Sequence, residues 1–103
     1  MSYNKVVAIL NVTDYALIRE QLMSLNIPGI SLSKIQGFGD YINEFTEDGF
    51  SDSMKIEIYT HAEQAEEIAE VLSVLANELT EGGGMVAIEP VANLFNVRKL
   101  TSY

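Results

Sequence analysis

The stretch Gly29-Ile-Ser-Leu-Ser-Lys-Ile-Gln-Gly-Phe-Gly39 alternates apolar and polar residues and then ends in a Gly-Phe-Gly tripeptide. The alternation predicts a half-buried β-strand over 30–35, and the glycines predict that the chain turns out of the strand after it. A second alternating stretch, Met54-Lys-Ile-Glu-Ile-Tyr59, predicts the next strand. The acidic segment 40–53 between the two strands is expected to form a loop.

The residues before this stretch predict a strand followed by a helix. Lys5-Val-Val-Ala-Ile-Leu10 is a β-branched apolar run suited to a buried strand. Thr13 and Asp14 supply a hydroxyl cap and a carboxylate for the start of the helix. Apolar residues three or four positions apart then define one helical face: Tyr15, Ile18, Leu22 and Leu25. Pro28 and Gly29 are expected to stop the helix.

The second half of the chain repeats this plan. Thr60-His-Ala-Glu63 fits a capping box, in which a hydroxyl and a carboxylate satisfy each other's backbone amides. A long apolar stripe follows it at helical spacing: Ala65, Ile68, Leu72, Leu75, Ala76 and Leu79. Gly82-Gly83-Gly84 ends the predicted helix, Met85-Val-Ala-Ile-Glu89 predicts a strand, and a short tail strand is expected at 94–97.

This order predicts an α+β fold, a ferredoxin-like βαββαβ sandwich with a short C-terminal strand, in one domain over 1–103. The sheet would be antiparallel, with both helices on one face. Ile35, Ile56, Ile58 and Val86 cannot all point toward the helices, because neighbouring side chains of a strand alternate between faces. The other face therefore needs a cover, and self-association is the simplest one for a domain this small.

Composition narrows the function. The chain carries 15 acidic and 6 basic groups and a net charge of −9, which argues against nucleic acid and anionic lipid as partners. There is no apolar run of about 20 residues and no N-terminal signal pattern, so we expect a cytoplasmic protein without direct membrane insertion. Zero cysteines exclude disulfides and thiolate metal sites. Any phosphate-bearing ligand must use the few cations: Lys5, Arg19, Lys34, Lys55, Arg98 and Lys99.

Two glycine-rich segments are candidate ligand loops. Gly37-Phe38-Gly39 ends a strand, and Gly82-Gly83-Gly84 lies between a helix and a strand. Glycine lets a backbone approach a ligand closely, and exposed amides in such loops can bind an anion. A glycine run after a helix is, however, often only the helix C-cap. Neither segment fits a phosphate-loop or dinucleotide fingerprint.

The Gly-Phe-Gly strand end, the Lys-Ile-Glu-Ile strand, the glycine-rich loop and a late arginine, taken in this order, resemble the PII signal-transduction family over nearly the whole chain. The resemblance implies a homotrimer that binds an adenine nucleotide between subunits. It places the nucleoside against Ile9, Ser31, Gly37, Phe38, Gly39, Glu57, Tyr59 and Thr60. It places the phosphates against Gly82, Gly83, Gly84 and Arg98.

The chain also departs from the family pattern. Met85 stands where the family usually has a lysine after the last glycine, and Asn96 replaces the first of two tail arginines. A triphosphate needs several cations or a metal. We therefore expect weak binding of ADP, AMP or ATP, with Mg²⁺ as a possible companion and no required cofactor.

The predicted effector loop, 40–53, departs further and gives no basis for oxoglutarate sensing or uridylylation. Ser53 replaces the lysine that the family uses for oxoglutarate, and Asp40 and Tyr41 stand where a glutamine is expected. We expect the aromatic residues of this loop to contact a partner: Tyr41, Phe45 and Phe50. In the PII-like branch such partners include membrane transporters, and a transporter is our candidate.

The leading hypothesis is therefore a PII-like trimeric signalling protein that reads adenine nucleotides and acts on a partner through its loop. The alternative is a CutA-like, metal-responsive trimer with cations at the acidic loop, which the lack of cysteine and clustered histidine weakens. We assign no metal ligand. An enzyme is not expected, because no nucleophile or acid–base pair can be assembled around the single histidine, His61.

Overall fold

The computed structural model describes residues 2–10, 15–24, 27, 29–37, 51–79 and 84–103. Within them the main elements are β1 (Tyr3–Leu10), α1 (Tyr15–Met23), β2 (Ile30–Gly37), β3 (Ser51–His61), α2 (Ala65–Leu79) and β4 (Gly84–Val91). A short 3₁₀ turn, η1 (Ala62–Gln64), joins β3 to α2. The tail adds β5 (Phe95–Asn96) and β6 (Thr101–Ser102).

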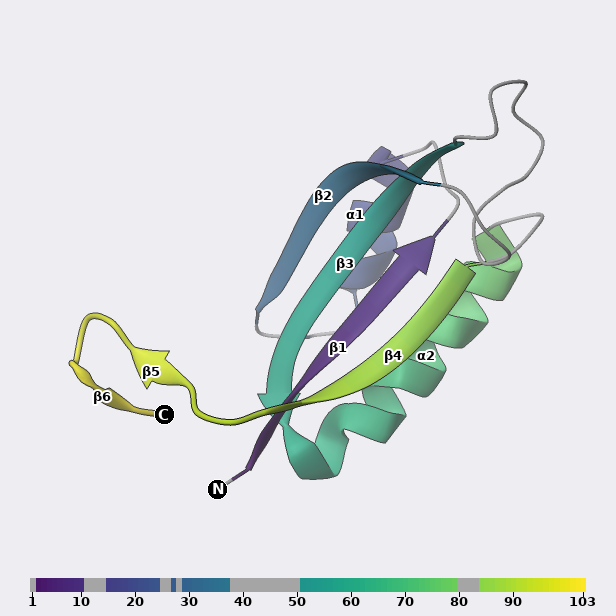
Figure 1. Cartoon of the computed structure of the whole chain (residues 1–103). Helices are drawn as coiled ribbons and strands as arrows, with labels where there is room; N and C mark the ends of the chain where they lie inside the picture. Colours follow the sequence, from purple (N-terminus) through teal and green to yellow (C-terminus); the bar gives the residue numbers. More distant parts are fainter. Residues whose placement is uncertain (1, 11–14, 25–26, 28, 38–50, 80–83) are drawn as a thin grey trace.

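The four long strands form one antiparallel sheet in the order β2-β3-β1-β4. Both helices lie behind this sheet in Figure 1, on the same face. The predicted α+β, ferredoxin-like βαββαβ arrangement is confirmed. It follows from two βα units whose first strands become the central neighbours of the sheet.

The core lies between the sheet and the helices. Alternate residues of the central strands point into it, and β1 and β3 bury theirs almost completely. The helices contribute residues from their apolar stripes, which confirms both predicted helical faces where the structure describes them. The main core residues are Val6, Ala8, Leu10, Ile18, Leu22, Met54, Ile56, Ile58, Ala65, Leu72 and Leu75.

The opposite face of the sheet, here called the outer face, has no helix over it in the described part of the chain. Register pairing places Ile35 there, opposite Ser53, whereas Ile56, Ile58 and Val86 lie on the helix side. The expectation that these isoleucines and Val86 could not share one face is confirmed.

Gly84 is required by packing at the start of β4. It pairs with Leu10, and its φ of +153° is one that L side chains rarely adopt. A β-carbon at this position would overlap the carbonyl oxygen of Ile9. The last glycine of the predicted ligand loop thus has a structural reason of its own.

The predicted loop 40–53 is too long at its end. Residues 51–53 belong to β3, where Ser51 pairs with Gly37 and Ser53 pairs with Ile35. Serine and aspartate have low strand propensity, but pairing with the end of β2 overrides it. Residues 40–50 lie outside the described residues.

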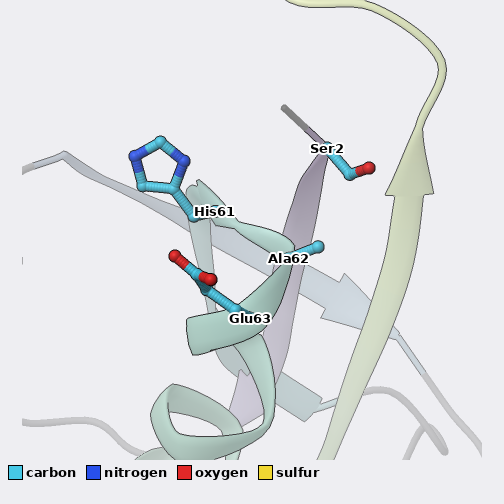
Figure 2. A pocket seen from close by; sticks show the side chains of 4 residues that line it. All are labelled: Ser2, His61, Ala62 and Glu63. Atoms are coloured by element: carbon cyan, nitrogen blue, oxygen red, sulfur yellow. The ribbon is translucent and has the colours of Figure 1, made fainter.

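The predicted capping box is wrong. Thr60 and His61 are the last residues of β3, because they pair with Asn4 and Tyr3 of β1. No side chain caps the turn that follows, and the Thr60 hydroxyl lies 3.3 Å from Gln64 Oε1. The Ala62 N–H instead donates a 2.9 Å hydrogen bond to the Ser2 carbonyl oxygen. Figure 2 shows this junction. The predicted helix caps at 13 and 14 lie outside the described residues.

The tail forms a small hairpin rather than the single strand expected at 94–97. β5 pairs with β6, and the Leu100 N–H donates to the Asn96 carbonyl oxygen at 2.8 Å. Leu100 has a φ of 56°, which closes the turn. The Tyr103 ring meets the Tyr3 ring of β1 edge-on, at a centroid distance of 6.3 Å. The hairpin projects from the end of the sheet where β4 finishes (Figure 1).

Candidate functional site

Four of the residues predicted to contact a nucleoside share the outer face. Ser31 and Glu57 are register partners, and Ile9 and Tyr59 occupy positions of the same parity on β1 and β3. Antiparallel partners point to the same side of a sheet, so these four side chains come from three adjacent strands of one surface. Tyr59 is 47% exposed, which leaves its ring available to a planar ligand.

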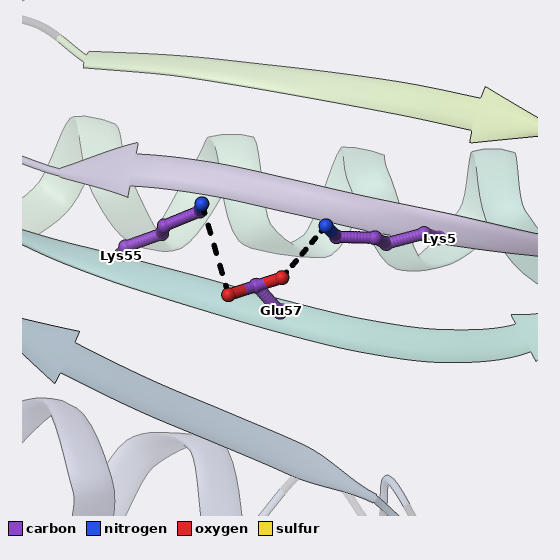
Figure 3. Close-up of polar contacts among 3 residues, drawn as sticks. All are labelled: Lys5, Lys55 and Glu57. Carbon is purple, nitrogen blue, oxygen red and sulfur yellow. Dashed lines mark ion pairs between the residues drawn. The ribbon is translucent and has the colours of Figure 1, made fainter.

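An ion cluster of Lys5, Glu57 and Lys55 lies in the middle of this surface (Figure 3). Lys5 Nζ is 2.7 Å from Glu57 Oε2, and Lys55 Nζ is 3.8 Å from Glu57 Oε1. The first contact is a charge-assisted hydrogen bond, whereas the second is too long to be one. The side chains remain 21–34% exposed, so water screens the cluster.

The cluster favours the charged forms of Lys5 and Glu57. The hydrogen bond from Lys5 is the main cause that lowers the pKa of the Glu57 carboxyl, with the charges of Lys5 and Lys55 adding to it. The same hydrogen bond raises the pKa of Lys5, and the charge of Glu57 raises it further. An ionised Glu57 accepts hydrogen bonds only, so it suits a ligand hydroxyl or amine and repels phosphate.

Two predicted glycines lie at one end of the sheet. Gly37 ends β2 opposite Ser51, and Gly84 begins β4 beside Leu10. Of the three glycines predicted at the phosphate end, the structure describes only Gly84. Seven other predicted positions lie outside the described residues: Phe38, Gly39, Tyr41, Phe45, Phe50, Gly82 and Gly83.

Two predicted site residues are not brought to the outer face of the same subunit. Thr60 occupies a position of β3 that lies on the helix side of the sheet, and its hydroxyl contacts Gln64. Arg98 is exposed in the turn of the tail hairpin, beyond the end of the sheet opposite to Gly84. Both roles remain predictions.

Sequence reasoning did not assign Lys5 and Lys55 to the site. A signal for Lys55 was present, because residues 55 and 57 are two apart in an alternating strand and so share a face. Nothing local indicated Lys5. Its proximity to Glu57 depends on the register between β1 and β3.

Two hollows lie away from the ion cluster. A cavity of about 290 Å³ is lined by Ser2, His61, Ala62 and Glu63 (Figure 2). The ring of His61 lies against Tyr3, with 4.8 Å between centroids. An open groove of about 500 Å³ separates α2 from β4, with Glu66 and Glu70 beside Val86 and Ile88. In the described part of the chain no three histidine, cysteine or acidic side chains are grouped to hold a metal.

Comparison with known proteins connects this geometry to one family. The family model described as "Nitrogen regulatory protein P-II" matches residues 3–100. A curated relative, the nitrogen regulatory protein P-II homolog of Oryza sativa subsp. japonica, is 28% identical over 104 residues, 93% of this chain and 49% of its own length. The chain therefore spans about half the length of that relative.

Two solved structures share the fold. Arabidopsis thaliana PII, bound to citrate, is 25% identical with a TM-score of 0.76, over 99% of this chain and 89% of its own. The B. subtilis GlnK-ATP complex is 16% identical with a TM-score of 0.74, over 98% of this chain and 94% of its own. Among the helices that the structure describes, none is both long and apolar enough to cross a membrane.

Proposed function

This chain belongs to the nitrogen regulatory protein P-II family, and on this premise we propose that it is a homotrimeric signalling protein that binds adenine nucleotides between its subunits. The family match over residues 3–100 is the observation that carries the proposal. Signalling, rather than catalysis, is the function that we assign to it.

The outer face supports self-association. Val7 is only 6% exposed, and its neighbours Ile9, Met85 and Ala87 are half-buried although neither of the described helices covers them. Together they form an apolar strip along β1 and β4. Covering this strip with further copies removes apolar surface from water, which favours association by roughly 25 cal/mol for each Å².

The nucleotide is assigned to the clefts that this association creates. The base and ribose would lie against Ile9, Ser31, Glu57 and Tyr59, with Gly37, Phe38, Gly39 and Thr60 completing this end. The phosphates would lie against Gly82, Gly83 and Gly84 of the same subunit and Arg98 of a neighbour. The ATP complex of B. subtilis GlnK supports the class of ligand, and citrate on Arabidopsis PII shows that an anion binds to a relative.

The signal would pass through the loop 40–50 to a protein partner. Tyr41, Phe45 and Phe50 are the aromatic residues that we assign to this contact. A nucleotide that favours one loop conformation would change the affinity for the partner, by no more than its own difference in affinity between the two states. We propose a membrane transporter as the partner and the cytoplasm as the compartment. No cofactor is required, and Mg²⁺ would accompany only the phosphates.

Calorimetric titration with AMP, ADP and ATP, each with and without Mg²⁺, tests the proposal directly. We expect binding that also raises the thermal midpoint, because a ligand at 100 times its Kd stabilises the folded state by about 2.7 kcal/mol. Arg98→Ala should abolish this shift, and the adjacent Lys99→Ala is the matched control. Binding of no adenine nucleotide at millimolar concentration would refute the nucleotide assignment. A shift unchanged by Arg98→Ala would refute only the role of Arg98.

A further inference from the structure

The ion cluster leaves one ammonium without a hydrogen-bonded carboxylate, because the further carboxylate of this face, Glu89 on β4, pairs in register with Lys5 and not with Lys55. Lys5 and Glu57 form a 2.7 Å pair and neutralise each other. Lys55 stands 3.8 Å from the same carboxylate, too far for a hydrogen bond, and its side chain is 34% exposed. The cluster therefore carries a net charge of +1 in a chain whose total is −9.

The other cations lie elsewhere. Of the 6 lysines and arginines in the chain, only Lys5 and Lys55 are on the outer face. Arg19 is on α1, and Lys34 has helix-side parity because it pairs with the core residue Met54. Arg98 and Lys99 are in the tail turn. Within one subunit, an anion on the outer face can thus meet only these two lysines.

The register places Lys55 in the row of residues next to that of Gly84, at the glycine end of the sheet. Ser33, Lys55, Ile9 and Met85 form one row across the four strands. Lys55 is two strands from Met85, about 10 Å at the backbone. A ligand over Ile9 is flanked by both side chains, but only Lys55 is charged. The Ser33 hydroxyl, exposed beside Lys55, offers a second donor.

We propose that Lys55 is the phosphate-contacting cation of the outer face, and that it supplies the charge that Met85 does not. The inference rests on the proposed nucleotide function, and it names a residue that the family resemblance does not assign. Lys5 makes the contact possible, because it satisfies Glu57 and leaves the donors of Lys55 to the ligand. Glu57 acts against the phosphate, because its carboxylate competes for the same ammonium.

The test compares ADP, adenosine and inorganic pyrophosphate by calorimetry on the full-length chain. Wild-type protein should bind ADP more tightly than adenosine. Lys55→Met should remove that difference, because it should lower the affinity for ADP at least about tenfold, the usual effect of losing a hydrogen bond between charged groups. Adenosine binding should not change, and Lys55→Arg should preserve the ADP affinity. Lys34→Met is the control, because it is the same substitution at a position of β2 that lies on the helix side of the sheet.

Glu57→Gln should strengthen pyrophosphate binding, whereas Lys55→Met should weaken it. Glu57→Gln frees Lys55 from its competitor, so pyrophosphate should bind several-fold more tightly than to wild type. Thermal midpoints measured without ligand establish that each variant is folded. A merely structural role for the cluster predicts weaker pyrophosphate binding in both Lys55→Met and Glu57→Gln, and so contradicts the proposal.

The outcomes separate this inference from the proposed function. ADP binding that survives Lys55→Met unchanged overturns the inference alone, as does a wild type that binds adenosine and ADP equally. Pyrophosphate binding that depends on Lys55, without any binding of ADP or adenosine, supports the inference and refutes the nucleotide function. If none of the three compounds binds, both fail.

Discussion

Lys5 and Glu57 meet across β1 and β3 at 2.7 Å although they are not register partners. Lys5 pairs with Tyr59 and Glu57 pairs with Val7, so the contact is a diagonal one between neighbouring strands. Diagonal positions are within the reach of long side chains, and the sheet therefore holds a carboxylate between two lysines at its centre.

The ion cluster makes stability depend on pH in a defined direction. The pKa of Glu57 is lowered by its hydrogen bond with Lys5, so its contribution is present above the ordinary carboxyl pKa and is lost as the pH falls through the lowered value. The pKa of Lys5 is raised, so its contribution is lost only as the pH rises through that raised value. We expect Glu57→Gln to be less stable than wild type by a constant amount between about pH 5 and pH 9, with the difference shrinking below about pH 4.

Urea denaturation across this pH range measures the difference. Glu70→Gln, on the exposed side of α2, is the matched control because it leaves the cluster intact. A Glu57→Gln difference that grows in acid would show that the sign of the linkage is wrong.

Gly84→Ala should destabilise the fold. A β-carbon there meets the Ile9 carbonyl oxygen at a φ of +153°, and strain of this kind costs about 1–3 kcal/mol before any displacement of β1. Gly29→Ala is the control, because nothing lies within 4 Å of its β-carbon position and its φ is not in the left-handed range. That substitution should be neutral or stabilise by up to about 1 kcal/mol through the unfolded state. Chemical denaturation measures the free energy of unfolding of both variants. An equal loss in Gly84→Ala and Gly29→Ala would contradict the role given to Gly84.

Leu72→Ala tests the packing of α2 on the sheet. Leu72 is fully buried in the core, so its truncation should cost about 2–5 kcal/mol. Val74 lies on the same helix but is 60% exposed, and Val74→Ala should change the free energy of unfolding by less than about 0.5 kcal/mol. Similar effects for the two variants would mean that α2 does not present this face to the core.

Self-association through the outer face predicts a particle of three times 11.4 kDa in sedimentation equilibrium. Ala87→Glu places a carboxylate in the apolar strip beside Val7, and it should shift the protein toward the monomer because an unpaired charge is costly to bury. Ala16→Glu, on the exposed side of α1, should leave the mass unchanged. A monomeric wild type would refute the proposed trimer.

The sequence predicted most of the fold because its signals are local. Residues 30–35 and 54–59 alternate in polarity, and the stripe through Leu72 and Leu75 repeats at helical spacing, so strand and helix could be assigned from neighbours alone. The errors fell where strand pairing decides the structure. Residues 51–53 and 60–61 are extended because β1 and β2 offer them partners, although serine, threonine and aspartate there favour loops and caps.

Part of the candidate site could likewise be predicted from the sequence, and part could not. The shared face of Ile9, Ser31, Glu57 and Tyr59 follows from alternation once the strand order is known, and the alternation itself is visible in the sequence. The ion cluster is not visible there. Lys5 and Glu57 come from opposite halves of the chain, and only the antiparallel register of β1 against β3 brings their side chains together.

By itself, the amino-acid sequence therefore determined where strands and helices form, that one face of the sheet lacks a helix, and that few cations are available to a phosphate. The tertiary structure alone decided how far β3 extends, why position 84 must be glycine, and which lysine is left without a hydrogen-bonded carboxylate. The physical reason is that polarity patterns act over a few residues, whereas pairing, steric exclusion and charge neutralisation depend on segments that meet only in the folded chain.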